Sequence, residues 1–395
     1  MDHKKILADL VPDIEILKCY GMTPDYDKNM NVLYSDLKEF LSIKFNNKPI
    51  EFLPNERIVF VHNDLDFFLD SNLPGFTLYN IQLVLRELDI PNWFCIVISN
   101  LPNYSKYTEL ARHKLTSETY PIQSITSMYF HHLREINDVQ FDYQLIVKPF
   151  IVLSRLSRFH RTYFMSQLFE KNLSEFGFIS YHNISAEHDA TPTSGILITS
   201  FPQLESTPCH FLYSVPYNRN YPEIVIHSEQ ARLRLKEFQA SVKSFKNFTE
   251  STDINDKGLC SNFQNNIIQS ALVYVGLEAS VNCPEVYLSE CSFKGILSKR
   301  PFILFGVAGT IAYLKQLGFK TFDQFWSEEY DNIENLESRV DAILTVLDQL
   351  KNKSESELHE MALQMSDILE YNFYHFNNDF LQYEKNNIIQ NMSSR

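Results

Sequence analysis

The sequence predicts an α/β protein in two parts, each built on a mainly parallel β-sheet. Continuous apolar segments alternate with amphipathic segments of helical period, which is typical of parallel strands covered on both faces. This pattern occurs once before and once after Pro149. The 395 residues also exceed the usual size of a single hydrophobic core, so two domains are expected.

The first part begins with residues 1–50, where apolar residues recur at helical spacing and predict a helical arm or cap. Residues 51–148 are predicted to form the first α/β domain. Within it, segments 57–63 and 92–100 are apolar enough for buried strands, and segment 75–89 between them has the period of an amphipathic helix.

The second domain is predicted over residues 149–345, and residues 346–395 are predicted to be C-terminal helices that return to the N-terminal domain. Segment 186–221 has no clean period and is rich in Pro, Ser and Thr, which indicates a long insertion. The predicted strands of this domain are 150–154, 271–279 and 301–305, and the predicted helices include 227–248 and 311–317.

Composition restricts the function classes. The net charge of −14 disfavours a nucleic-acid acceptor, because such acceptors are bound largely through Lys and Arg. No apolar run of about 18 residues is present, so no membrane span is predicted. The 6 cysteines have no spacing typical of zinc ligands, and no metal site is predicted. Because the charged N-terminal segment lacks a signal-peptide core, we expect a cytoplasmic protein.

A glycine turn is the first candidate for ligand binding. The predicted strand 301–305 runs directly into Gly306 and Gly309, and a helix starts immediately afterwards. Such a turn leaves backbone N–H groups unpaired at the positive end of a helix dipole, which suits a phosphate. The alternative is that the glycines only permit a tight turn.

Charged residues precede this turn. Glu290, next to Ser289, is a candidate to accept hydrogen bonds from ribose hydroxyls, and the cations that follow it are candidates to face a diphosphate. The alternative for Glu290 is an acid that complements a helix N-terminus. The cations are Lys294, Lys299 and Arg300.

A second group of cations follows the predicted strand 150–154. Arginines at the carboxyl end of a parallel strand can bind a diphosphate and stabilise the charge on a leaving nucleotide. The alternative is a solvated helix face with a capping histidine. The residues concerned are Arg155, Arg158, His160 and Arg161.

These segments resemble glycosyltransferase-like proteins of viruses and phages, and more distantly the fucosyltransferases. The resemblance implies two Rossmann-like domains facing a cleft, of the GT-B type, with the nucleotide-sugar donor on the C-terminal domain. It adds Glu278 as a donor-binding candidate, and it departs at Cys291, where a lysine is expected. Besides the arginine block, it is carried in order by Ser289-Glu290, Pro301-Phe302-Ile303, Leu317-Gly318-Phe319, Glu329-Tyr330-Asp331 and Arg339.

The resemblance implies transfer of a sugar from a nucleotide sugar to a hydroxyl of a glycan, a protein or a small molecule. No cofactor or bound metal is expected, because arginines and helix N-termini can supply the charge stabilisation. The N-terminal domain would supply the general base, for which His62, Asp64 and Asp66 are candidates at the end of strand 57–63. A viral protein of this kind would act in the host cytoplasm.

Two other functions stay open. The lysine missing at Cys291 is compatible with a degenerate, non-catalytic binding module of the same fold. Asp64 and Asp66 after a buried strand are also compatible with a metal-dependent phosphotransferase, although Phe68 stands where that motif has Thr or Val. Aspartates after a strand are, in addition, ordinary loop formers.

Overall fold

The structure is a computed structural model. It describes residues 139–154, 159–182, 226–242, 244–247, 266–278 and 288–393, positions 281 and 286, and the backbone of four N-terminal strands; a few side chains within these ranges, including that of Glu290, are not described. The chain divides into two compact units. Unit 1 comprises residues 1–134, 213–219 and 381–395, and unit 2 comprises residues 135–212 and 220–380.

Unit 1 contains a parallel sheet in the order β1-β2-β3-β4. Strands β2 and β3 confirm the predicted strands 57–63 and 92–100. The helix α12 lies beside β4, so the helical tail returns to the N-terminal part of the chain. The bounds are β1 Glu15–Met22, β2 Glu56–Asp64, β3 Trp93–Ser99, β4 Ser124–Ser127 and α12 Leu381–Ser393.

Strand β1 corrects part of the predicted helical arm. Its residues pair in parallel with β2, with Glu15 opposite Glu56 and Tyr20 opposite Phe60. Pairing with the edge of β2 satisfies backbone groups of both strands, and this tertiary gain outweighs local helix propensity. The apolar spacing that indicated a helix lies at residues 33–41, outside the described residues.

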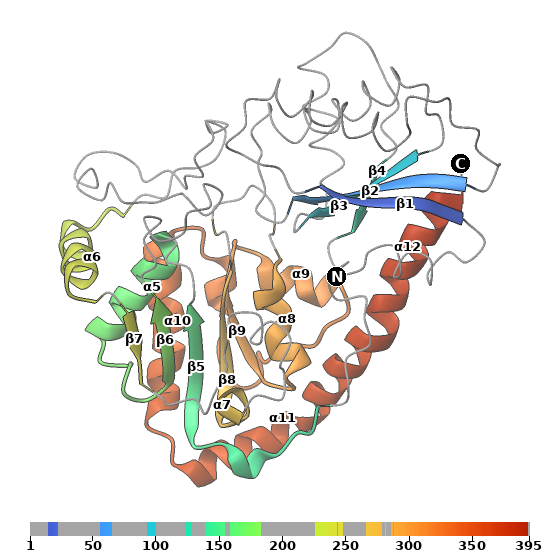
Figure 1. The fold of residues 1–395 in the computed structure, drawn as a ribbon. Helices are drawn as coiled ribbons and strands as arrows, with labels where there is room; N and C mark the ends of the chain where they lie inside the picture. Colours follow the sequence, from blue (N-terminus) through green and yellow to red (C-terminus); the bar gives the residue numbers. More distant parts are fainter. Residues whose placement is uncertain are drawn as a thin grey trace. The chain divides into compact units, whose positions relative to one another are not determined.

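Unit 2 contains a five-stranded sheet in the order β7-β6-β5-β8-β9 (Figure 1). All its pairs are parallel except β6 with β7. Its strands β5, β8 and β9 confirm the three strands that the sequence predicts here. The bounds are β5 Lys148–Ser154, β6 Phe178–His182, β7 Ser244–Lys246, β8 Ala271–Leu277 and β9 Phe302–Phe305.

Strand β7 corrects the end of the predicted helix 227–248. That helix, α6 (Glu229–Ser241), ends before the chain turns into β7. The ring of Phe245 in β7 packs 4.7 Å from that of Phe169. Partial burial of this aromatic side chain and pairing with β6 stabilise an edge strand where local periodicity favours a helix.

The sheet of unit 2 reverses its winding between β5 and β8. The chain passes from β5 through α5 (Phe159–Glu170) to β6 on one side, and from β8 through α8 (Glu290–Leu297) to β9 on the other. Because such crossovers are almost always right-handed, α5 and α8 cover opposite faces. Helix α10 (Leu336–Lys351) contacts α5, and α11 (Glu355–His375) contacts α8 (Figure 1).

The core of unit 2 lies around its central strands. Every residue of β8 is buried, and α5 is buried around most of its circumference. Pro149 lies at the start of β5, where its missing N–H is tolerated. The shorter elements are η2 Tyr143–Leu145, α7 Asn266–Gln269, α9 Thr310–Gln316, η4 Glu329–Asn332 and the π-helix η5 Phe376–Phe380.

These observations confirm an α/β fold and place β2 and β9 in different sheets. The arrangement of two Rossmann-like domains facing a cleft stays a prediction. In the part of the chain that the structure describes, no helix has the length and apolar character needed to cross a membrane.

Candidate functional site

The reversal point of unit 2 is the first place to look for a ligand site. In open α/β sheets, ligands bind in the crevice beyond the carboxyl ends of the strands at such a point. Arg161 lies near the start of the helix that follows β5, and Glu278 directly follows β8. The structure therefore brings these two predicted donor-binding residues, which are far apart in sequence, to one edge of the sheet.

Arg161 is held in place by the backbone at the end of β8. Its Nε donates to the carbonyl oxygen of Glu278 over 3.1 Å, and His160 Nε2 lies 2.8 Å from the same oxygen. Arg161 Nη2 lies 4.0 Å from the sulfur of Cys291 at the start of α8. The third nitrogen, Nη1, has no hydrogen-bond partner among the described residues. A positioned guanidinium with a donor to spare can bind an anion at this edge.

The carboxylate of Glu278 binds the first turn of α8. It accepts from the N–H of Ser289 over 3.1 Å and from the Ser289 hydroxyl over 2.5 Å, and the Ser292 hydroxyl donates to its other oxygen. Glu278 is 0% exposed. This geometry favours a role in positioning α8 over the direct contact with the donor that the resemblance implies.

Gly276 in β8 allows α8 to approach the sheet closely. A Cβ atom at this position would lie 2.8 Å from the carbonyl oxygen of Cys291 and 2.7 Å from the side chain of Leu304. The first clash is with backbone, so it can be relieved only by moving α8. The close approach keeps the start of α8 near Arg161.

We expect Gly276→Ala to lower the free energy of unfolding of unit 2 by about 1–3 kcal/mol, the usual cost of overpacking. The chain has 2 tryptophans, of which Trp326 lies in unit 2 and Trp93 in unit 1. Urea unfolding followed by Trp326 fluorescence in a Trp93→Phe background measures the effect. An unchanged midpoint would show that α8 does not pack as described.

The glycine turn does not present the free N–H groups that the sequence predicts. The carboxylate of Asp331 accepts from the N–H of Ile311 over 2.9 Å and from that of Ala312 over 3.0 Å. The Asp331 carbonyl oxygen accepts from the N–H of Gly309 over 2.8 Å. Gly309 has φ 89°, which explains the glycine by backbone conformation alone. The start of α9 is therefore capped from within the chain.

Arg339 completes this capping network. It donates to the carbonyl oxygens of Gly306 and Ile333, and over 2.9 Å to that of Glu334. Burial raises the pKa of Asp331, against the lowering effects of its two N–H partners and of Arg339. Gly306 and Asp331 thus have structural roles, and donor binding by Gly306 and Gly309 stays a prediction.

Two of the predicted cations lie at the opposite edge of the sheet. Arg300 is fully buried and donates to the carbonyl oxygen of Ala271, the first residue of β8, and to the side chain of Gln269. Burial lowers its pKa to about 9. Lys299 forms an ion pair of 2.8 Å with Glu370 of α11. The hypothesis that either cation replaces the missing lysine beside a donor phosphate is wrong, because both precede β9 and lie near the amino ends of the strands.

The remaining predicted residues are placed only in part. Lys294 lies in the last turn of α8 and is buried. His62 and Asp64 lie at the carboxyl end of β2, as predicted, and Glu290 begins α8, but the side chains of these three are not described. Residues outside the described part are Arg155, Arg158 and Asp66.

The sequence analysis did not identify the serines that hold the start of α8 at the carboxyl ends of the strands. Ser289 is the N-cap of α8, and its hydroxyl accepts from the N–H of Cys291 over 3.2 Å. A serine before a helix is a recognisable capping signal. The contacts of Ser289 and Ser292 with Glu278, by contrast, depend on strand order and have no local signal.

No protein-family model matches the sequence, and no curated protein gives a significant match. Among solved structures, the chain is similar to a DNA-modifying enzyme, beta-glucosyltransferase, crystallised in the presence and absence of its substrate uridine diphosphoglucose. The sequence identity is 10%, the match covers 94% of this chain and 98% of that chain, and the TM-score is 0.39. At this score the likeness carries no argument about function, and the viral and fucosyltransferase resemblance stays a prediction.

Proposed function

We propose that this chain is a glycosyltransferase that binds a nucleotide sugar at the reversal point of unit 2 and transfers the sugar to a hydroxyl acceptor. The position of Arg161 is the observation that carries the proposal. Arg161 lies on the helix that follows β5 and binds the backbone at the end of β8, and one of its nitrogens is available to a ligand. The crevice at this point is where open α/β sheets bind nucleotides.

The chemistry follows from the charge that develops during transfer. As the bond between sugar and phosphate breaks, negative charge grows on the leaving nucleoside diphosphate. The fixed guanidinium of Arg161 would stabilise that charge without a bound metal. Glu278 would act indirectly, by fixing α8 through its contacts with Ser289 and Ser292. The acceptor hydroxyl would lose its proton to a base from His62, Asp64 or Asp66.

Cys291 keeps the degenerate binding module as the second candidate. The resemblance expects both the arginine of α5 and a lysine at position 291, and here Arg161 Nη2 lies 4.0 Å from the sulfur of Cys291. Turnover of a nucleotide sugar distinguishes a working site from a binding module.

The test combines binding and turnover. Isothermal titration of uridine and guanosine diphosphates, with EDTA and with magnesium, should show binding that does not need the metal. Release of nucleoside diphosphate from nucleotide sugars should then be measured with glycan, protein, small-molecule and duplex DNA acceptors. Binding without turnover favours the binding module, strict magnesium dependence favours the phosphotransferase, and no binding contradicts the proposal.

We expect Cys291→Lys to lower the thermal stability of the free protein, because the new ammonium group meets Arg161. The same change should increase the stabilisation by uridine diphosphate, since the ligand would neutralise both cations. Thermal unfolding with and without the diphosphate measures both effects, and Cys291→Ser is the control. Equal ligand-induced shifts in the two variants would remove position 291 from the diphosphate site.

A further inference from the structure

The thiol of Cys291 is a candidate site of covalent modification. Cys291 is the second residue of α8 and is partly exposed, which leaves a small reagent access to it. Its N–H donates to the hydroxyl of Ser289 over 3.2 Å, so the backbone that carries the thiol is fixed. A thiol becomes a nucleophile when a neighbouring cation stabilises its thiolate form, and the charges next to the sulfur therefore decide its chemistry.

Arg161 is the cation next to this sulfur. The residue is 7% exposed, and it makes no ion pair within the described residues. Its Nε donates to the carbonyl oxygen of Glu278 over 3.1 Å, its Nη2 lies 4.0 Å from the sulfur of Cys291, and its Nη1 has no hydrogen-bond partner in the part of the chain that the structure describes. The carboxylate of Glu278 accepts instead from Ser289 and Ser292. A buried cation without a partner favours the formation of an anion beside it.

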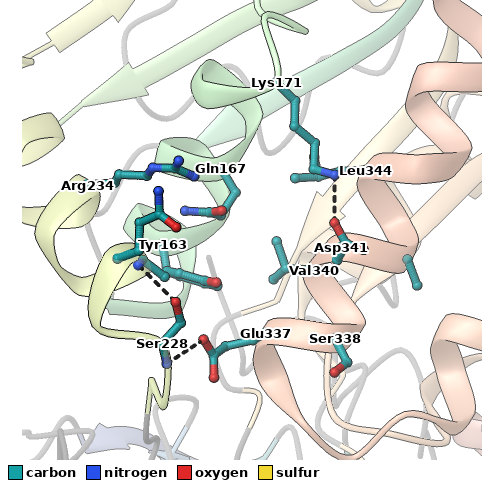
Figure 2. Close-up of a pocket in the computed structure, with 13 residues that line it drawn as sticks. Tyr163, Gln167, Lys171, Ser228, Arg234, Glu337, Ser338, Val340, Asp341 and Leu344 are labelled. Atoms are coloured by element: carbon teal, nitrogen blue, oxygen red, sulfur yellow. Dashed lines mark hydrogen bonds and ion pairs between the residues drawn. The ribbon is translucent and has the colours of Figure 1, made fainter.

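Two cations near the C-terminal end of α5 have the compensation that Arg161 lacks. Figure 2 shows Lys171 paired with Asp341, over 2.6 Å. Arg234 of α6 pairs with Glu170 over 3.1 Å. Both cationic side chains are 36% exposed, so water also screens their charges. Arg161 is buried and has no such carboxylate, and the thiol of α8 is a group beside it that can become an anion. This environment therefore stabilises the thiolate.

We propose that Cys291 is a peroxide-sensitive cysteine, whose thiolate is stabilised by Arg161 and is oxidised by hydrogen peroxide to a sulfenic acid. The thiolate sulfur attacks one peroxide oxygen, so that an S–O bond forms as the O–O bond breaks. The sulfur loses two electrons, and the departing hydroxide takes up a proton and becomes water. Nη1 of Arg161 is available to donate to the departing oxygen, where negative charge develops, and this lowers the barrier.

Oxidation would place a new oxygen beside the guanidinium that is proposed to bind the diphosphate. This consequence rests on the proposed function, because it requires that Arg161 binds the donor. The sulfenic acid would compete with the diphosphate for the donors of Arg161, so peroxide would reduce donor binding until a reductant restores the thiol. The reactivity of the thiol itself does not depend on a nucleotide, and it can be measured on the protein alone.

Mass spectrometry of the full chain after brief treatment with hydrogen peroxide and dimedone, which traps a sulfenic acid, tests the proposal. Digestion after glutamate separates Cys291 from Cys283, because Glu285 and Glu290 lie between them. An ordinary thiol is only about 3% ionised at about pH 7. At this pH, Cys291 in the folded protein should be oxidised at least about tenfold faster than in the urea-unfolded chain. Arg161→Gln should remove most of this acceleration, because it removes the charge.

Arg234→Gln is the matched control, because it removes an arginine that pairs with Glu170 and does not contact the thiol. It should be oxidised at Cys291 within about twofold of wild type, and circular dichroism should show both variants folded. The proposal is overturned if Cys291 reacts no faster in the folded protein than in the unfolded chain, or if the two variants react alike. Excess uridine diphosphate should slow the oxidation. Binding of the diphosphate without this protection would contradict the competition for Arg161, and no binding would contradict the proposed function alone.

Discussion

Arg161→Ala is expected to reduce the affinity for a nucleoside diphosphate by about 10- to 150-fold, which corresponds to the 1.5–3 kcal/mol typical of a hydrogen bond to a charged group. The guanidinium is the described cation that lies at the carboxyl ends of β5 and β8 with a donor available. The fold should survive the change, because the carbonyl oxygen of Glu278 keeps His160 as a partner 2.8 Å away. Arg161→Lys should recover part of the affinity, as a lysine keeps the charge but not the fork of donors.

Lys299→Ala provides the matched control. This lysine was also a candidate to face the diphosphate, but its ammonium group pairs with Glu370 and lies 4.7 Å from the centre of the Phe373 ring. Isothermal titration should therefore give wild-type affinity for this variant. Equal losses in Arg161→Ala and Lys299→Ala would contradict the assignment, and so would wild-type affinity in Arg161→Ala.

Arg161 and Lys299 differ because the order of the strands places them at opposite ends of the parallel strands. A residue that directly precedes a strand lies at its amino end, so the position of Lys299 and Arg300 before β9 was readable from the sequence. The reversal between β5 and β8 was not readable, because it depends on which strands become neighbours. Apolar runs predicted β5, β8 and β9 themselves, since burial of a parallel strand requires such runs.

The glycine turn is a second case in which a residue distant in sequence decides the local structure. The sequence predicts correctly that a strand ends in glycines and that a helix follows. It predicts that the N–H groups of Ile311 and Ala312 are free, which is wrong. Both donate to the carboxylate of Asp331, which lies about 20 residues later and has no local signal. Strand β1 was missed for a similar reason, since its pairing with β2 has no local signal.

The capping network leads to the largest expected effect on stability. Asp331→Ala should lower the free energy of unfolding of unit 2 by about 3–6 kcal/mol, because it removes two hydrogen bonds to a charged acceptor, each worth about 1.5–3 kcal/mol. The N–H of Ile311 would be left buried without its partner. Arg339, which is 3% exposed, would also lose its nearby negative charge.

The pH dependence of a second variant, Asp331→Asn, separates the charge from the hydrogen bonds. The pKa of Asp331 is raised in the folded protein. A raised folded pKa contributes stability that is fully present below the unfolded pKa and is lost as the pH rises through the folded value. The wild-type protein should therefore lose stability relative to Asp331→Asn as the pH rises above about 4, the ordinary pKa of an aspartate.

Asp323→Ala is the control for the alanine variant, because Asp323 also contacts α9 but does so at the surface. Its ion pair with Lys315 measures 2.9 Å, and its side chain is 56% exposed, so its removal should cost at most about 1 kcal/mol. Urea unfolding followed by Trp326 fluorescence, in the Trp93→Phe background, compares both variants in unit 2. Equal losses, or a loss below about 1 kcal/mol for Asp331→Ala, would show that the N–H groups of α9 do not depend on this carboxylate. In that case the start of α9 would again be a candidate for binding a phosphate, as its glycines suggest.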